Sequence, residues 1–255
     1  MTTKLGLRLV AGMLVSSAVC AAWAQDLEDV KKRITAAWKN HRTMTAKMDS
    51  LTQFDFGVMS VESKATGTIE VMREGDTFKS RMELRVSNTR KMGEESETME
   101  QKALTVVDGE YVWTLMEMGE QKQAMKAKAT EQSAPDPARM LTGLREEFNL
   151  KVLPDEKVDG REAWVIEATP KTPGAIPIVR MVQYFWKEHG VLLKSVGYTA
   201  EGQTANTITF SEHKFDEKID PARFTLTVPE GVTVIDQTAA TPGPVAPTGE
   251  APEKP

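Results

Sequence analysis

The chain has 255 residues, of which 40% are hydrophobic and 27% are charged, and its formal net charge is −5. Such a composition is typical of a globular protein, and it excludes a collagen-like chain, a wholly disordered chain and a membrane protein with many spanning helices. Because acidic residues are in excess, the chain lacks the broad positive field that attracts phosphate backbones, and we expect no nucleic-acid partner.

The first 24 residues have the pattern of a secretory signal peptide. Lys4 and Arg8 begin it, residues 9–19 are mainly apolar, and residues 22–24 (Ala-Trp-Ala) form a small-x-small cleavage signal. The apolar run is short for a hydrocarbon layer of about 30 Å. We therefore expect cleavage after Ala24 and export to the periplasm, rather than retention by an uncleaved N-terminal anchor.

The single cysteine, Cys20, lies within this predicted signal peptide. It follows Val19, whereas a lipidation site has Gly, Ala or Ser before its cysteine. We therefore expect an exported protein without a lipid anchor. The mature chain would contain no disulfide, no thiolate nucleophile and no zinc–sulfur site.

An amphipathic helix is predicted over residues 26–48, with Asp26 as its cap. Apolar side chains recur at three- and four-residue steps on one face, among them Leu27, Val30, Ile34 and Trp38.

The apolar period changes to two after residue 53, which predicts that the chain enters a β-sheet. Turn signals then follow at short intervals, and Asp-Gly in particular supplies the positive φ angles of a tight hairpin. They lie at residues 74–76, 108–109, 159–160, 189–190 and 201–202. We expect an antiparallel meander with strands over residues 101–108, 110–118, 161–169, 179–187, 191–199 and 205–215.

A second helix is predicted to begin at Asp136-Pro137, a cap followed by proline at the first helical position. Its apolar stripe should lie against the sheet and consists of Met140, Leu141, Leu144 and Phe148. Several predicted strands have apolar side chains on both faces, which favours a strongly curved sheet that holds helices or a ligand in its concavity.

Residues 239–255 are rich in Pro, Ala, Thr and Gly and have no apolar pattern. This composition predicts a disordered tail. The folded part would then be a single domain of residues 25–238, preceded by the signal peptide at residues 1–24.

No motif of an enzyme site is present: there is no Gly-x-Ser-x-Gly elbow, no phosphate loop and no dinucleotide fingerprint. The three histidines, His41, His189 and His213, show no metal-ligand spacing, and we interpret them as solvated side chains. A hydrolase acting on envelope material stays an alternative only through scattered carboxylates, which one sequence does not place in space. We expect no enzyme, no cofactor and no metal.

Methionine is abundant, and 12 of the 14 methionines follow residue 24. Its flexible thioether side chain re-packs around ligands of differing shape, so these residues predict either a plastic core or an adaptable apolar binding surface. If the helices cover a concave sheet, the methionines between the two layers are Met44, Met48, Met72 and Met140.

Three segments resemble the LolA family of periplasmic lipoprotein carriers and, more loosely, the LolA-like superfamily that includes LolB and the lipid-sensing domain of RseB. Residues 105–127 (TVVDGEYVWTLMEMGEQKQAMKA) are similar to the family's hairpin, with Asp-Gly in the turn and a Trp on the return strand. Residues 65–75 (ATGTIEVMREG) are similar to its segment that ends in Arg-Pro. Residues 220–237 (DPARFTLTVPEGVTVIDQ) match the family's C-terminal ending, a Phe followed by Pro-x-Gly-Val.

The resemblance implies a fold that is mainly β with helices (α+β): a curved, unclosed antiparallel sheet, or half-barrel, with helices covering its concave face. It also implies an apolar cavity that shields acyl chains, and a lid arginine, matching Arg73, that hydrogen-bonds to a helix and closes the empty cavity. Glu74 replaces the proline that follows this arginine in the family. The candidate ligand-binding residues are Trp38, Met44, Phe54, Phe56, Arg73, Trp113, Met140, Leu141, Leu144 and Phe185.

The function that the resemblance implies is that of a monomeric periplasmic carrier, which binds lipoprotein or lipid acyl chains and shuttles them toward the outer membrane. Its partners would be an inner-membrane donor and an outer-membrane acceptor. The alternative is an RseB-like sensor or interaction domain that binds a lipidated or protein ligand in the cell envelope. A carrier needs no second domain, which favours carriage because only the Pro-rich segment follows the predicted fold.

Overall fold

The computed structural model describes residues 26–75, 77–130, 133, 135–172 and 177–238. The predicted signal peptide with Cys20 and the Pro-rich segment of residues 239–255 lie outside the described residues. Both assignments, and the limits of the domain between them, stay predictions.

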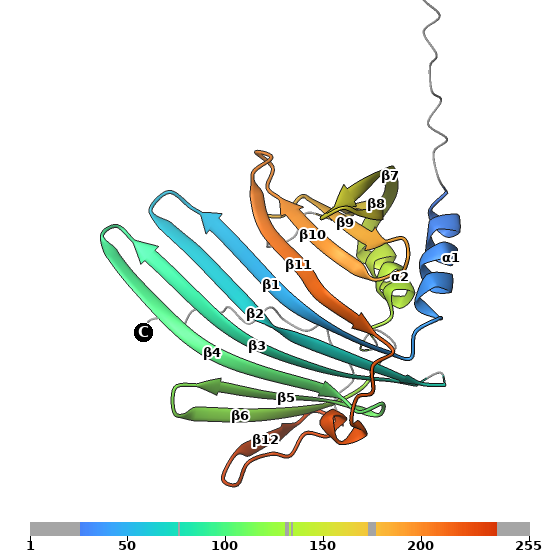
Figure 1. Ribbon diagram of the computed structural model, residues 1–255. Helices are drawn as coiled ribbons and strands as arrows, with labels where there is room; N and C mark the ends of the chain where they lie inside the picture. The colour runs from blue at the N-terminus through green and yellow to red at the C-terminus, as the bar shows by residue number, and fades with distance from the viewer. Residues whose placement is uncertain (1–25, 76, 131–132, 134, 173–176, 239–255) are drawn as a thin grey trace, which may run out of the picture.

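One strongly curved sheet forms most of the molecule (Figure 1). Its twelve strands are β1 (Thr43–Asp55), β2 (Met59–Glu74), β3 (Thr77–Met92), β4 (Glu95–Val107), β5 (Tyr111–Met118), β6 (Gln121–Lys128), β7 (Phe148–Val158), β8 (Arg161–Pro170), β9 (Arg180–Trp186), β10 (Leu192–Tyr198), β11 (Thr204–Phe215) and β12 (Thr233–Asp236). They lie side by side in the order β12-β6-β5-β4-β3-β2-β1-β11-β10-β9-β8-β7. Neighbours are antiparallel except β12 and β6, which are parallel, and the sheet is unclosed. The predicted fold class is confirmed.

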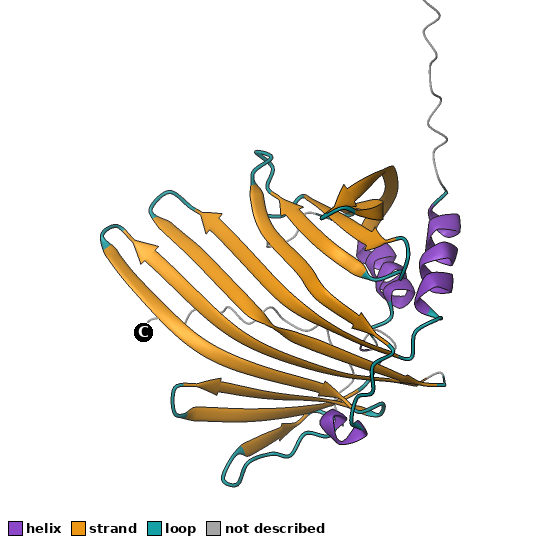
Figure 2. Ribbon diagram, viewed as in Figure 1, coloured by secondary structure: helices purple, strands orange, loops and turns teal. Residues whose placement is uncertain are grey.

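Two α-helices, α1 (Leu27–Trp38) and α2 (Pro137–Glu147), pack on the concave side of the sheet near β7 to β10 (Figure 2). The helical period places Val30 and Ile34 on the sheet side of α1, where neither has any exposed surface. With Leu141 of α2 they form a core cluster against the sheet residues Trp164, Ile166 and Phe185.

The first helix is shorter than predicted. It ends at Trp38, and residues 43–55 form β1, so Met44 and Met48 lie on a strand instead of a helix. The reason is local: from Thr43 to Met48 polar and apolar residues alternate strictly, and this period of two fits a half-buried strand. Asp26 is the N-cap residue of α1, but its side chain makes no capping hydrogen bond.

The predicted meander is correct within two groups of strands, β4–β5 and β8–β11, and wrong about how these groups are connected. β4 pairs with β5, and β8 through β11 pair in sequence. However, β5 and β8 are not neighbours, because the connection through α2 takes the chain across the concavity to the far edge, and β11 returns to pair with β1. Six strands were absent from the predicted set. They are β1 and β2, whose region was predicted only to enter the sheet after residue 53, and β3, β6, β7 and β12.

A glycine brings the β9–β10 hairpin against α1. Gly190 has a φ of +70°, and a Cβ at this position would lie 2.3 Å from the carbonyl oxygen of Ile34 and 2.9 Å from the amide nitrogen of Trp38. Any other residue would hold the hairpin away from the helix. The close approach lets Val191 join a second core cluster with Trp38, Met44, Val71 and Phe78.

The C-terminal segment lies on the opposite, convex face. Arg223 of the 3₁₀ helix η2 (Pro221–Phe224) donates from Nε to Oε2 of Glu70 at 2.6 Å, and Phe224 is buried beside it. Glu70 precedes Val71 on β2, and successive side chains on a strand point to opposite faces. The C-terminal segment therefore does not cover the concave face, on which the helices lie.

Candidate functional site

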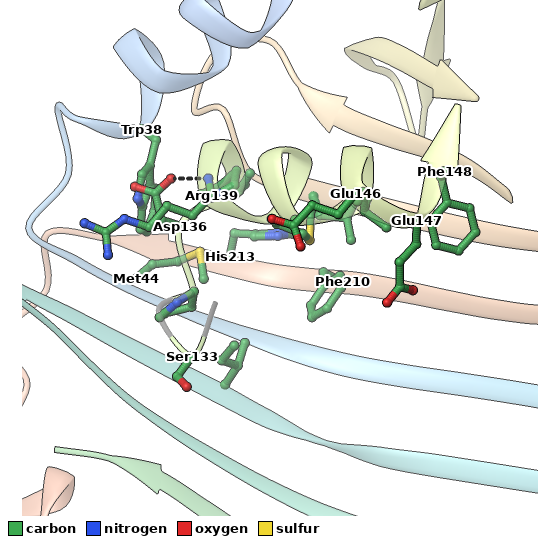
Figure 3. A pocket seen from close by; sticks show the side chains of 18 residues that line it. Trp38, Met44, Ser133, Asp136, Arg139, Glu146, Glu147, Phe148, Phe210 and His213 are labelled. Atoms are coloured by element: carbon green, nitrogen blue, oxygen red, sulfur yellow. Dashed lines mark hydrogen bonds between the residues drawn. The ribbon is translucent and has the colours of Figure 1, made fainter. Parts of the chain in front are cut away.

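A cavity of about 530 Å³ lies between α2 and the concave face of the sheet (Figure 3). Strands β1, β2, β7, β10 and β11, the end of α1 and the segment before α2 supply the rest of its wall. The apolar side chains that line it are Trp38, Met44, Ile69, Met140, Leu144, Phe148, Val191, Leu192 and Phe210. Its character is that of a binding site for an apolar ligand.

The position of α2 over the cavity follows from its cap. The Asp136 carboxylate accepts hydrogen bonds from the amides of Ala138 at 2.8 Å and Arg139 at 3.0 Å, as the sequence predicted for this helix start. The helical period then directs Met140 and Leu144 to the cavity. Polar side chains of the same segment also border the cavity, namely Asp136, Arg139, Glu146 and Glu147.

Methionines line the concave face beyond the cavity. Directly paired residues on neighbouring strands share a face, and the register places Met48, Gly67, Leu84, Ala103 and Met116 in one row across β1 to β5. Nine of the ten methionines on β1 to β6 share the face of Met44; Met72 points the other way. They are Met44, Met48, Met59, Met82, Met92, Met99, Met116, Met118 and Met125.

These methionines extend the apolar wall of the cavity along the strands. Met48 pairs with the cavity residue Phe210, so the row of paired residues that contains Met48 begins at the cavity wall. Toward the hairpin tips the side chains become accessible, and Met92 and Met99 are 52% and 51% exposed. The concave face is therefore a methionine-lined surface that leads into the cavity.

The three histidines come together beside the cavity, which corrects their interpretation as solvated side chains. His41 contacts Asp216 through Nδ1 at 2.9 Å, and its Nε2 lies 2.9 Å from Nδ1 of His189. The ring of His189 stacks on Phe215 with centroids 4.1 Å apart. Because these residues are far apart in the sequence, no spacing motif could have revealed the cluster.

The Asp216 carboxylate fixes the direction of the hydrogen bonds that it receives. Hydrogen bonds from the backbone of Arg42 and from His41 lower the pKa of Asp216, so this carboxylate is an acceptor and His41 donates from Nδ1. The Nε2 atom of His41 faces Nδ1 of His189 at 2.9 Å. Burial lowers the pKa of His189, which favours its neutral form.

A β-bulge places His213 at the cavity wall. On β11, Lys214 pairs with Thr45 and Ser211 pairs with Lys47, so Glu212 and His213 together oppose one residue of β1. Glu212 has a φ of +51°, a left-handed conformation that is uncommon outside glycine. The extra residue puts His213 and Phe215 on the same face as Phe210, which unbroken alternation would not do.

Six of the predicted ligand-binding residues lie in or beside the cavity. Trp38, Met44, Met140 and Leu144 line it. Leu141 and Phe185 lie in the core between the helices and the sheet, with 1% and 0% exposure.

Three other predicted residues lie away from the cavity. Phe54 and Phe56 are at the tip of the β1–β2 hairpin, with ring centroids 6.2 Å apart. Trp113 pairs with Val106, which pairs with Arg81 and so belongs to the convex face, and its Nε1 donates to Asp108. Alternation alone does not say which face of a strand is concave, which is why the sequence did not separate Trp113 from the cavity residues.

Arg73 contacts the end of α1. Its guanidinium donates to the carbonyl oxygen of Lys39, and its backbone amide donates to the carbonyl of Arg42 at 2.8 Å. A cation at this end of a helix interacts favourably with the unpaired carbonyls and the helix dipole. The contact between Arg73 and a helix is thus present, while its role as a latch stays a prediction.

Among residues 26–238, apart from the few left undescribed, no helix is long and apolar enough to span a bilayer. Within the same residues no group of three or more His, Cys, Asp or Glu side chains is arranged to hold a metal ion.

No protein-family model and no curated protein matches the sequence. Among solved structures, an uncharacterized conserved protein from Thermus thermophilus aligns with a TM-score of 0.51 and 12% identity, over 83% of this chain and 99% of that one. A chain of the Pseudomonas aeruginosa MucA/MucB complex aligns with a TM-score of 0.44 and 15% identity, over 78% of this chain and 60% of that one. A LolA superfamily protein from Nitrosomonas europaea aligns with a TM-score of 0.31 and 12% identity, over 80% of this chain and 99% of that one. At these identities the likeness concerns the fold alone.

Proposed function

We propose that the protein binds the acyl chains of a lipid or lipoprotein in the cavity under α2 and carries them through the cell envelope. The observation that supports this function best is an apolar cavity of about 530 Å³ that continues into a methionine-lined surface. Sites for small molecules have volumes of about 300–1,000 Å³. The predicted signal peptide would bring the protein to the periplasm, where such a carrier meets both membranes.

The affinity of such a site comes from burial of methylene groups. Each buried methylene contributes about 0.8 kcal/mol, so roughly eight of them supply about 6 kcal/mol before the entropic costs of association. Methionine side chains adapt to chains of differing length and unsaturation. The site therefore needs no catalytic group, only a donor that releases the acyl chain and an acceptor that binds it better.

A charge inside the cavity tests the site directly. Leu144→Glu should weaken binding of a fluorescent fatty-acid probe by at least about tenfold, because burial of an unpaired carboxylate opposes burial of the chain. Thr142→Glu is the matched control, since it adds the same charge to the exposed side of the same helix. Equal affinities of the two variants would contradict the proposal.

The natural cargo can be sought in the exported protein itself. Purification from the periplasmic fraction without detergent, followed by lipid extraction and mass spectrometry, should recover acyl-bearing molecules from the wild type and fewer from Leu144→Glu. Absence of any enriched acyl-bearing molecule, in a wild-type sample that binds the probe, would argue against carriage.

A further inference from the structure

Methionine supplies all the sulfur of the predicted mature chain, because the single cysteine, Cys20, lies in the predicted signal peptide. Nine of the ten methionines on β1 to β6 share the concave face. Three of these nine are the most exposed methionines of the described residues: Met92, Met99 and Met118, at 52%, 51% and 39%. The accessible thioether groups therefore gather on the face that leads into the cavity.

These three side chains lie outside the packed core. Met92 and Met118 immediately precede the turn glycines of the β3–β4 and β5–β6 hairpins, at the end of the sheet away from the helices (Figure 1). Met99 lies on β4, and none of the three belongs to either core cluster. A chemical change at their sulfur atoms would thus remove no contact from those clusters.

Other methionines are shielded from a dissolved oxidant. Met44 and Met72 are both only 8% exposed, so burial limits access to their sulfur atoms. Met59 pairs with Met92 across β2 and β3, but its sulfur accepts a hydrogen bond from Nε of Arg90 at 3.2 Å. That bond engages a lone pair of the sulfur, which is the reactive group. The exposed three should therefore react first.

We infer that Met92, Met99 and Met118 form an oxidation-sensitive site, at which conversion to methionine sulfoxide lowers the affinity for the alkyl chain. The oxidant is a peroxide. The thioether sulfur attacks one oxygen of hydrogen peroxide, the O–O bond breaks, a sulfur–oxygen bond forms, and the other oxygen leaves with both hydrogens as water. Sulfur is oxidised by two electrons and the peroxide is reduced by two. The inference rests on the proposed function, because it requires that the alkyl chain reaches this surface.

A sulfoxide makes the surface polar where the ligand needs it to be apolar. Its oxygen accepts hydrogen bonds from water, and methylene groups that cover it would remove those bonds without replacing them. Methionine sulfoxide reductases, each specific for one sulfoxide epimer, convert the side chain back to methionine. Oxidation at this site would therefore control ligand binding reversibly.

Controlled oxidation of the full mature chain with hydrogen peroxide tests the site. Peptide mass spectrometry gives the sulfoxide fraction at each methionine. A dansyl-labelled fatty acid, added after the peroxide is removed, gives the dissociation constant. The ratio of the constants after and before oxidation is taken within each protein, so that any effect of a substitution on binding itself cancels.

Two variants are compared with wild type. The first is the triple variant Met92→Leu, Met99→Leu and Met118→Leu, in which leucine keeps the apolar bulk and has no sulfur to oxidise. The second is Met72→Leu, a control for a buried methionine on the opposite face.

In wild type, sulfoxide should form at Met92, Met99 and Met118 before it forms at Met44 and Met72. The dissociation constant should then rise by about three- to tenfold, and treatment with both reductases should restore it. The triple variant should keep its dissociation constant through the same treatment. Met72→Leu should lose as much affinity as wild type.

Two results would overturn the inference while leaving the cavity as an acyl site. One is an unchanged affinity of wild type after the three residues are oxidised, and the other is an equal loss of affinity in the triple variant. Failure of unoxidised wild type to bind the probe would instead overturn the proposed function, and the oxidation-sensitive site with it.

Discussion

The concave face has two halves that are built from similar strands and differ in what covers them. Over β8 and β9 it is filled by the helices, and Trp164, Ile166 and Phe185 are almost fully buried against them. Over β1 to β3 the helices cover only the end near Trp38, where Met44, Val71 and Phe78 are buried. Farther along β1 to β6, side chains such as Met48 and Met116 stay partly accessible. Apolar surface that a fold leaves unburied usually marks a binding site. The comparison assigns stability to the first half and ligand binding to the second, with the cavity at their boundary.

The largest expected effect is on the covered half. Phe185→Ala should lower the free energy of unfolding by about 3–5 kcal/mol, because it removes a fully buried ring from the helix–sheet core. Met116→Ala, in the open half, should lower it by less than about 1.5 kcal/mol. Urea unfolding followed by circular dichroism measures both, and similar losses would erase the distinction between the halves.

A charge in the open half should affect binding more than stability. Met116→Glu is expected to weaken binding of a fluorescent fatty-acid probe by about tenfold, because the carboxylate would lie in the path of the alkyl chain. Leu51→Glu makes a similar change on the convex face, where Leu51 is 36% exposed and pairs with Lys64. If both variants bind the probe equally, the methionine-lined surface is not part of the site.

Substitutions of Arg73 test whether its contact with the end of α1 acts as a latch on the cavity, which lies at the boundary between the two halves. If its contact with the Lys39 carbonyl favours a closed state, Arg73→Leu should slow dissociation of the bound probe by about three- to tenfold, since the closed state helps to expel the ligand. Arg73→Lys keeps the charge near the end of the helix and should show a smaller change. Stopped-flow displacement gives the rates, and a wild-type rate in the leucine variant would exclude a latch.

The smallest effect concerns pH. The pKa of His213 is about 4 in the folded protein, below the usual 6.5, so the unfolded chain binds this proton more readily. Its contribution to stability is complete above pH 6.5 and is lost as the pH falls toward 4. The unfolding free energy of His213→Asn should therefore depend less on pH across this range, by at most one proton. Parallel curves for the two proteins would mean that His213 titrates normally.

Local signals predicted much of the fold. Asp159-Gly160 forms the expected hairpin turn, with φ angles of +49° and +79°, and Asp136 caps α2 as predicted. These features depend on a few adjacent residues, whose conformational preferences are visible in any sequence. The resemblance to LolA-like proteins supplied the half-barrel, which periodicity alone does not give.

Long-range features could not be predicted in the same way. The pairing of β11 with β1 depends on the whole path of the chain, and the face of Trp113 depends on the direction of curvature. His213 was missed for a different reason: one inserted residue at Glu212 breaks the period of two from which its orientation would be read. Of the candidate site, the helix residues Trp38, Met140 and Leu144 were predictable, because a helical stripe must face the sheet.

Photo-crosslinking tests the central claim most directly. A fatty acid with a diazirine on its alkyl chain is bound to the protein and irradiated, and the crosslinked residues are mapped by peptide mass spectrometry. Crosslinks on Met44, Met140 and Leu144 and on concave methionines such as Met48 are the predicted result. Crosslinks spread over the convex face, or labelling that excess unlabelled fatty acid does not reduce, would contradict an acyl-chain site in the cavity.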